Sequence, residues 1–174
     1  GAGAQVAISG RDETAAVAMA ADLRAAGCDA HGLPMDAHSV PQMQDSVDAV
    51  ARHFGKLDIL VNCVGMQREQ ALLEVTEEAF DEVLQVNLKA AMFLAQAVAK
   101  KQIEGGAGGS QMHLLSVRSQ LGLRGRGYSA YCSSKGGLVM LIRQHASELA
   151  PHGITVNGIA PTVVRTEMAR HWLE

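Results

Sequence analysis

The chain has 174 residues, of which 48% are apolar and 19% charged, and its formal net charge is −3. This composition is typical of a globular protein with a packed core. The basic residues are scattered, which argues against nucleic acid or an anionic membrane as a partner, and no apolar run approaches the ~20 residues that cross a bilayer. The three cysteines are far apart and the histidines are dispersed, so we expect no disulfide framework, no metal site and a cytoplasmic location.

Short apolar runs alternate with longer helical patterns along the chain. The predicted strands are residues 6–9, 29–35, 57–61, 112–115 and 154–159. The predicted helices are residues 12–26, a segment from a cap at Ser39 to Phe54, residues 76–103 and residues 129–150. This alternation predicts an α/β fold, a doubly wound parallel sheet with helices on both faces, in one domain over residues 1–174. Because residues 57–61 are LDILV, we expect that strand to be buried on both faces.

In such sheets a ligand binds at the carboxyl ends of the strands. The residues that follow the predicted strands are therefore the candidates for a site. They are Ser9-Gly10-Arg11, Asp36, Asn62 to Gly65, Ser116, and Pro161 to Thr166.

The pair Tyr131 and Lys135 lies one helical turn apart. A free phenol has a pKa of about 10, and a nearby ammonium lowers that value, which allows the phenol to exchange a proton with a carbonyl or alcohol oxygen. Ser116 is placed to hydrogen-bond the same oxygen. Tyr128 is a poorer candidate because Cys132 stands four residues after it. The competing interpretation of Tyr131 and Lys135 is an ordinary surface pair.

With these residues in order, the chain resembles the short-chain dehydrogenase/reductase family over essentially its whole length. The family's Tyr-x-x-x-Lys matches Tyr131 and Lys135, its serine matches Ser116, with Ser119 as an alternative, and its helix asparagine matches Asn87. The resemblance implies that Tyr131 is the general acid/base and that Lys135 lowers its pKa and binds the nicotinamide ribose. It also implies that Ser116 orients the substrate oxygen and that Asn87 holds a water in a proton relay.

Further family motifs point to a dinucleotide. Asn62-Cys63-Val64-Gly65 resembles the family's Asn-Asn-Ala-Gly turn, with Cys and Val in place of Asn and Ala. Asp36 stands where the family has an aspartate near the adenine. Pro161 and Thr166 match the family's Pro-Gly…Thr motif, although Thr162 replaces the glycine, and the resemblance places Thr166 at the nicotinamide carboxamide.

The residues after the first predicted strand bear on the choice of cofactor. An acidic residue there would bind the adenosine 2′-hydroxyl of NAD and repel a 2′-phosphate. The sequence instead has Gly10 and Arg11, and a guanidinium suits a phosphate. We therefore expect NADP, with NAD as the alternative and an exposed loop charge as the competing interpretation of Arg11.

The expected reaction is hydride transfer between NAD(P) and a secondary alcohol or ketone, such as a sugar, a sugar acid or a 3-oxoacyl compound. Arg118 and Arg124 lie in the loop between Ser116 and Tyr131, so a carboxylate-bearing substrate is a hypothesis; a solvated basic loop is its alternative. The family's usual interface, formed by the two long helices, implies a homodimer or homotetramer, although core packing explains those helices equally well. The rival function is a non-catalytic or truncated member of the fold that acts as a binding module.

The opening Gly1-Ala2-Gly3 precedes the first predicted strand. A dinucleotide fingerprint needs its glycines after a strand and at the start of a helix. We therefore expect the phosphate-binding loop and the family's first, central strand to lie upstream of the given sequence. We likewise expect the family's substrate lid and last strand to lie beyond Glu174, so that the fold is incomplete at both ends.

Overall fold

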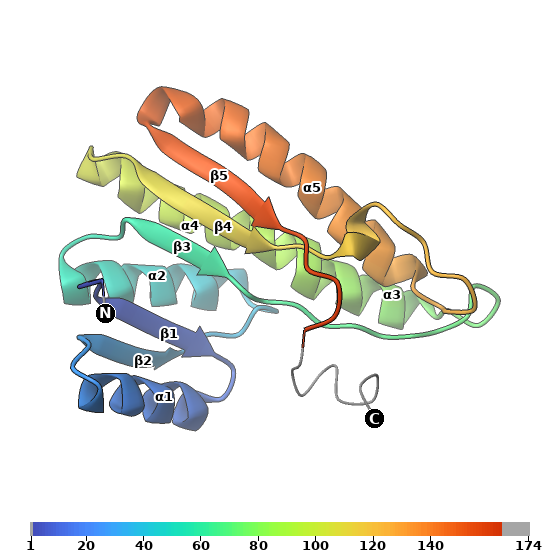
Figure 1. Ribbon diagram of the computed structural model, residues 1–174, viewed down its shortest axis with the longest axis horizontal. Helices are drawn as coiled ribbons and strands as arrows, with labels where there is room; N and C mark the ends of the chain where they lie inside the picture. The colour runs from blue at the N-terminus through green and yellow to red at the C-terminus, as the bar shows by residue number, and fades with distance from the viewer. Residues whose placement is uncertain (1, 165–174) are drawn as a thin grey trace.

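The computed structural model describes residues 2–164, in which parallel strands alternate with helices (Figure 1). The strands are β1 (Val6–Gly10), β2 (Ala30–Pro34), β3 (Ile59–Asn62), β4 (Gly109–Leu114) and β5 (Ile154–Ile159). The helices are α1 (Glu13–Ala25), α2 (Val40–Phe54), α3 (Glu77–Leu84), α4 (Ala90–Gly105) and α5 (Ser129–Leu149). A π-helical segment η1 (Gln85–Lys89) joins α3 to α4, and two short 3-10 turns are η2 (Val117–Ser119) and η3 (Ala150–His152). The predicted α/β fold is confirmed.

The strands form two parallel sheets, one with the order β1-β2 and one with the order β3-β4-β5. Within residues 2–164, no ladder joins β1 to β3. Neighbouring residues of β2 show that helices lie on both sides of its sheet, because successive side chains of a strand point to opposite faces. The His31 ring stacks on His53 of α2 at 4.2 Å between centroids, whereas a Cβ on Gly32 would meet the backbone of Ala16 in α1 at 2.5 Å.

Short polar side chains begin three of the helices. Asp12, Ser39 and Thr76 each accept a hydrogen bond from the backbone N–H three residues later. These bonds satisfy donors that a helix leaves without an internal partner. The predicted helix starts at residues 12, 39 and 76 are therefore confirmed.

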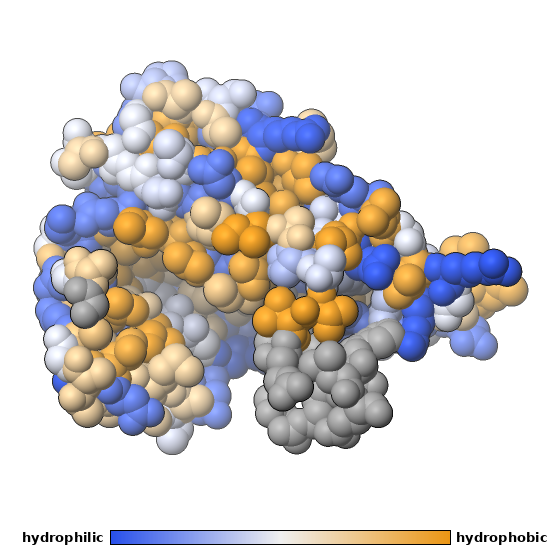
Figure 2. Space-filling view, in the orientation of Figure 1, coloured by the Kyte–Doolittle hydropathy of each residue, from blue (hydrophilic) through white to orange (hydrophobic). Residues whose placement is uncertain are grey.

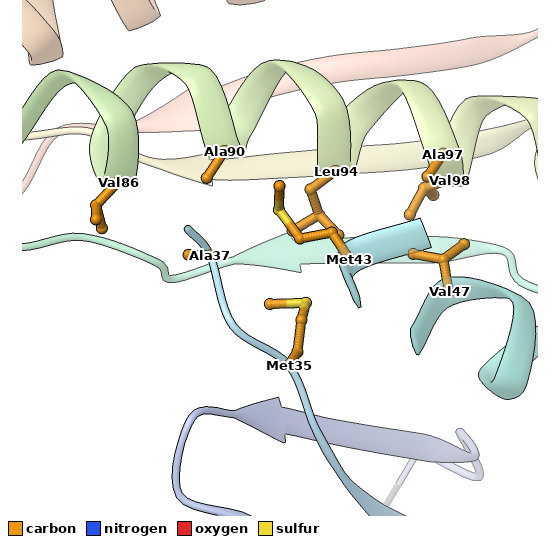
Figure 3. Close-up of a cluster of buried hydrophobic side chains, with 9 residues drawn as sticks. All are labelled: Met35, Ala37, Met43, Val47, Val86, Ala90, Leu94, Ala97 and Val98. Carbon is orange, nitrogen blue, oxygen red and sulfur yellow. The ribbon is translucent and has the colours of Figure 1, made fainter. Parts of the chain in front are cut away.

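A cluster of buried apolar side chains joins the segment after β2 to α2 and α4 (Figure 3). Met35 and Ala37 follow β2 and pack against side chains from α2, η1 and α4. The other members are Met43, Val47, Val86, Ala90, Leu94, Ala97 and Val98. Because Asp36 lies between Met35 and Ala37, this packing fixes the position of one candidate site residue.

One face of β3 is exposed, which corrects the prediction that this strand is buried on both faces. Leu60 and Asn62 point to the helices, but the side chains of Ile59 and Val61 are 61% and 60% exposed. Within residues 2–164, helix α4 lies behind β3 and β4 in Figure 1, and apolar residues remain visible across the front of the sheet in Figure 2. A continuous apolar run predicts that a strand can be buried on both faces, but it does not show which faces are covered.

The predicted helix over residues 76–103 is interrupted at η1, where the hydrogen bonds widen to the π pattern. Single-turn π segments occur mostly inside α-helices and frequently at functional sites. Among the residues that the structure describes, no helix is long and apolar enough to cross a membrane.

Candidate active site

The carboxyl ends of the strands are joined by backbone hydrogen bonds in the loops that follow them. The Met35 N–H donates to the Gly10 carbonyl at 2.9 Å, and the Val117 N–H donates to the Pro161 carbonyl at 3.1 Å. Gly10 and Asn62 end strands β1 and β3, and the other predicted strand-end residues follow within two positions of their strands: Asp36, Ser116 and Pro161. Thr166 lies outside the described residues.

Tyr131 and Lys135 lie one turn apart at the start of α5, and the Lys135 Nζ is 5.9 Å from the centroid of the Tyr131 ring. Lys135 is only 4% exposed. Its ammonium donates a hydrogen bond to the Leu114 carbonyl of β4 at 2.7 Å. Strand β4 therefore fixes the position of the lysine that the sequence paired with Tyr131.

The phenol of Tyr131 has a raised pKa, chiefly because burial disfavours its charged form. A side-chain hydrogen bond from Ser116 and the positive charge of Arg118 oppose that rise. The expectation that Lys135 lowers this pKa is not met: the causes of the shift do not include Lys135, whose Nζ donates to the Leu114 carbonyl. Arg118 is thus an electrostatic partner of Tyr131 that the sequence pattern did not reveal.

Lys135 has a pKa lowered to about 8, because burial penalises its charged form. An electrostatic interaction with Cys63 opposes this shift. The Lys135 ammonium therefore loses its proton at a lower pH than an ordinary lysine does.

Ser116 is buried and caps η2, where its hydroxyl accepts a hydrogen bond from the Arg118 N–H at 3.2 Å. The same side chain is hydrogen-bonded to Tyr131. The hydroxyl of Ser119, the alternative, is buried and has no hydrogen-bond partner among the residues that the structure describes. The structure therefore brings Ser116, rather than Ser119, to the phenol.

Asn87 lies in η1 and is 1% exposed. Its amide oxygen accepts from the Met66 N–H at 2.7 Å, and its amide nitrogen donates to the Met66 carbonyl at 2.9 Å and to the Ser134 hydroxyl at 3.0 Å. Ser134 in turn donates to the Tyr131 carbonyl at 2.7 Å. Asn87 therefore links the segment after β3 to the first turn of α5, a connection that sequence spacing could not show.

Asn62 and Gly65 bound the turn that follows β3. The Asn62 side chain accepts from the Val64 N–H at 3.0 Å, and its other end lies 3.1 Å from Nδ1 of His113. A Cβ on Gly65 would lie 3.5 Å from the Lys135 Nζ. The turn from Asn62 to Gly65, hereafter the Asn62 turn, thus approaches the buried lysine directly.

His113 is a residue that the sequence analysis missed, because the histidines were interpreted as dispersed. It is fully buried on β4, and burial lowers its pKa to about 4. The available signal was its place two residues after Gln111, another buried polar residue on the same face of the strand.

Asp36 and Arg11 lie near each other at the ends of β2 and β1. The pKa of Asp36 is lowered chiefly by hydrogen bonding from the His38 backbone N–H, at 2.9 Å, and then by the His38 side chain. The charge of the exposed Arg11 acts in the same direction. The structure therefore places a carboxylate and a guanidinium together at this end of the site.

The two candidate substrate arginines have different surroundings. Arg118 is half-buried and donates to the Gly122 carbonyl at 3.4 Å, whereas Arg124 is exposed. Tyr128, the poorer catalytic candidate, is 7% exposed and hydrogen-bonds to Gln67 and Glu69. Only Arg118 of the two arginines acts electrostatically on Tyr131.

These residues fit the ribose and adenosine portions of a nicotinamide dinucleotide. A buried ammonium is suited to sugar hydroxyls, and Lys135 provides one between β4 and the Asn62 turn. Arg11 and Asp36 supply donors and acceptors where the adenosine end would lie. Within residues 2–164, no glycine-rich strand-to-helix turn is present to test the fit of the pyrophosphate.

Comparison with known proteins identifies the class of this fold and site. The family model described as short chain dehydrogenase matches residues 1–174, and the chain belongs to that family. It is 46% identical over 126 residues to an L-xylulose reductase of Mesocricetus auratus, covering 72% of this chain and 51% of that protein. It is 34% identical over 171 residues to a sorbitol dehydrogenase of Cereibacter sphaeroides, covering 98% of this chain and 63% of that protein.

A solved structure is similar over nearly the whole chain. It is a gluconate 5-dehydrogenase from Burkholderia cenocepacia in complex with NADP and tartrate, with a TM-score of 0.92 and 30% identity. The match covers 98% of this chain and 66% of that one. This chain thus spans between about half and two thirds of the length of these relatives.

Proposed function

We propose that the protein is an NAD(P)-dependent oxidoreductase that interconverts a secondary alcohol and a ketone. The observation that carries this proposal is the buried phenol of Tyr131, hydrogen-bonded to Ser116 and one turn before the buried Lys135. Membership of the short-chain dehydrogenase family supports it. No finding favours the alternative of a non-catalytic binding module.

In the direction of reduction, the Tyr131 hydroxyl donates its proton to the carbonyl oxygen of the substrate. A nicotinamide cofactor, when bound, would supply the hydride for the carbonyl carbon. Ser116 donates a hydrogen bond to the same oxygen and orients it, and Lys135 binds the nicotinamide ribose. The proton on Tyr131 is then replaced from solvent by way of Lys135 and a water that Asn87 holds.

NADP is the proposed cofactor, and NAD is the alternative. Arg11 supports this preference, because it is an exposed guanidinium beside the end of β1, with no carboxylate at the strand tip itself. Asp36 would bind near the adenine, and the remaining proposed contacts come from Gly10, Asn62, Gly65, Pro161 and Thr166.

The purified protein is expected to reduce NADP+ with a polyol or sugar acid and to show a higher kcat/KM for NADP+ than for NAD+. The measurement is the absorbance of the reduced nicotinamide during turnover with a panel of polyols, sugar acids and 3-hydroxyacyl compounds. A preference for NAD+ would overturn the proposed role of Arg11. Absence of turnover together with absence of NADPH binding would contradict the proposed function.

We propose a sugar or sugar acid as the substrate class. Support comes from Arg118, whose charge acts on the phenol of Tyr131 and whose guanidinium suits a carboxylate. The names of the relatives, which are sugar and polyol enzymes, agree with this class.

Replacing Arg118 with alanine is expected to raise KM for acidic substrates about tenfold or more, because the variant would lose a hydrogen bond to a charged group. KM for neutral polyols should change little. Arg124→Ala should have a smaller effect, since Arg124 is exposed, and Arg143→Ala on α5 is a control for loss of a positive charge. If neither Arg118→Ala nor Arg124→Ala changes KM for any acidic substrate, the anionic-substrate hypothesis is wrong.

We also propose that the chain acts as one catalytic domain in a cytoplasmic homo-oligomer, a dimer or tetramer, without nucleic acid or membrane partners. Support for assembly comes from a groove of about 970 Å³ that is lined mainly by residues of α3 and η1, and also by Met92 and Phe93 of α4 and Leu141 of α5. Leu138, another candidate for the interface, is 1% exposed and belongs to the core, whereas Met140 is 58% exposed.

A further inference from the structure

His113 lies at the centre of a buried polar contact whose direction can be worked out atom by atom. The Val64 N–H is a donor, so the Asn62 atom that accepts from it, at 3.0 Å, is the amide oxygen. The amide nitrogen of Asn62 therefore faces His113, at 3.1 Å from Nδ1. Because that nitrogen carries only donors, Nδ1 of His113 must accept and is unprotonated.

His113 is accordingly a neutral ring with its proton on Nε2. Burial, together with the nearby charges of His145 and Lys135 on α5, lowers its pKa to about 4, which agrees with the neutral form. The Nε2 atom has no hydrogen-bond partner within residues 2–164. A buried donor without a partner is costly, so the ring is retained at this position at some cost to stability.

The Asn62 turn is held at both of its ends. At one end, His113 accepts from Asn62, whose oxygen in turn accepts from Val64 two residues later. At the other end, Met66 exchanges two hydrogen bonds with Asn87, at 2.7 and 2.9 Å. Between these anchors, Gly65 approaches the ammonium of Lys135.

We propose that His113 is a positioning residue, which orients the Asn62 side chain as a hydrogen-bond acceptor and thereby holds the Asn62 turn against Lys135 for cofactor binding. Its role in cofactor binding rests on the proposed function. The orientation of Asn62 does not, because it follows from the contacts of the protein alone. Strand β4 and the residues just after it then hold three parts of the site. His113 contacts Asn62, the Leu114 carbonyl accepts from Lys135, and Ser116 hydrogen-bonds to Tyr131.

Two substitutions separate the acceptor from the ring. His113→Asn places an amide oxygen at the position of Nδ1, since both are δ atoms attached to the same carbon, and removes Nε2. His113→Leu also removes Nε2 but leaves a methyl group where the acceptor was. Both variants lose the ring and its Nε2–H, and His113→Asn alone adds an amide NH2 where the ring had Cδ2.

His113→Leu is expected to weaken NADPH binding about tenfold, as for loss of one buried hydrogen bond, and to speed exchange of the Val64 amide hydrogen by a similar factor. Its kcat with saturating cofactor should change little. His113→Asn should behave as the parent protein in all three measurements. If the two variants bind NADPH equally and exchange the Val64 amide equally, the acceptor role of His113 is wrong.

A measurement on the unaltered protein covers the case in which a variant does not fold. Nitrogen NMR of the His113 ring at neutral pH is expected to show a protonated Nε2 and an unprotonated Nδ1. A proton on Nδ1, or a charged ring, would overturn the proposal. If the tautomer is as expected but NADPH does not bind the parent protein, the proposed function fails while the orientation of Asn62 stands.

Discussion

Replacing Tyr131 with phenylalanine is expected to lower kcat by about 10²- to 10⁴-fold, the range for removal of a general acid/base, while NADPH affinity stays nearly unchanged. The substitution deletes only the hydroxyl that is hydrogen-bonded to Ser116. The ring keeps its place beside Lys135 and its edge-to-face contact with Tyr128, at 6.3 Å between centroids. The two measurements are steady-state turnover and the fluorescence of bound NADPH.

Tyr128→Phe is the matched control. It removes a second phenol hydroxyl, on a ring whose centroid lies 6.3 Å from that of Tyr131, and this hydroxyl hydrogen-bonds to Gln67 and Glu69. We expect this variant to lose some stability and to keep kcat within a few-fold of the parent value. Unchanged turnover in Tyr131→Phe, or an equal loss in both variants, would contradict the catalytic assignment of Tyr131.

Replacing Lys135 with methionine is expected to abolish turnover and, at neutral pH, to make the protein more stable by about 2 kcal/mol. Burial lowers the pKa of Lys135 from 10.5 to about 8, and each tenfold loss of proton affinity corresponds to about 1.4 kcal/mol. The charged lysine therefore costs the folded state about 3 kcal/mol, and loss of its hydrogen bond to the Leu114 carbonyl offsets about 1 kcal/mol of the gain. On this account, the buried charge of Lys135 lowers the stability of the folded protein.

The sign of this effect has a specific pH dependence. Between pH 8 and 10.5 the unfolded chain binds more protons at this lysine than the folded protein does, so its contribution to stability rises with pH across that window. The stability difference between Lys135→Met and the parent protein should therefore be largest below pH 8 and shrink toward pH 10.5. Denaturant unfolding at several pH values measures it, and Lys100→Met, at an exposed lysine of α4, is the control. A less stable Lys135→Met protein at neutral pH would show that the burial penalty is not the dominant effect.

The sequence predicted the elements well where a local signal exists. The last strand has the predicted bounds, Ile154–Ile159, because its β-branched residues lie between a glycine and a proline-containing segment. Ser39 and Thr76 marked helix starts because their side chains accept backbone hydrogen bonds at the first turn. Strand β4 begins at Gly109, earlier than predicted. The local sequence around Gly109 favours a loop, but pairing with Ile154 of β5 holds this glycine in the strand.

Features that depend on contacts between distant segments could not be predicted in this way. The π-helical η1 is not visible in a pattern that remains helical, although it places Asn87 between Met66 and Ser134. The exposure of each face of β3 likewise depends on which helices pack against that face. These properties arise from tertiary packing, which local propensity does not encode.

The candidate site likewise has features that local sequence patterns predict and features that depend on distant contacts. Spacing alone identified Tyr131 and Lys135, because residues four apart on a helix share a face. The upward direction of the pKa shift of Tyr131 could not be predicted, because it is set by burial, which the positive charge of Arg118 only partly opposes. The contact between His113 and Asn62 joins residues 51 positions apart, and no local pattern signals it.

The most direct test of the central claim is transfer of deuterium from NADPH that carries deuterium at both positions of the reactive carbon of the nicotinamide. The ketone or keto acid related to the best substrate of the panel would be reduced, and the product analysed by mass spectrometry and NMR. Our account predicts one deuterium at the new carbinol carbon in the product of the parent protein, formed far more slowly by Tyr131→Phe. Oxidation of the cofactor without deuterium at that carbon, or equal product formation by both proteins, would contradict it.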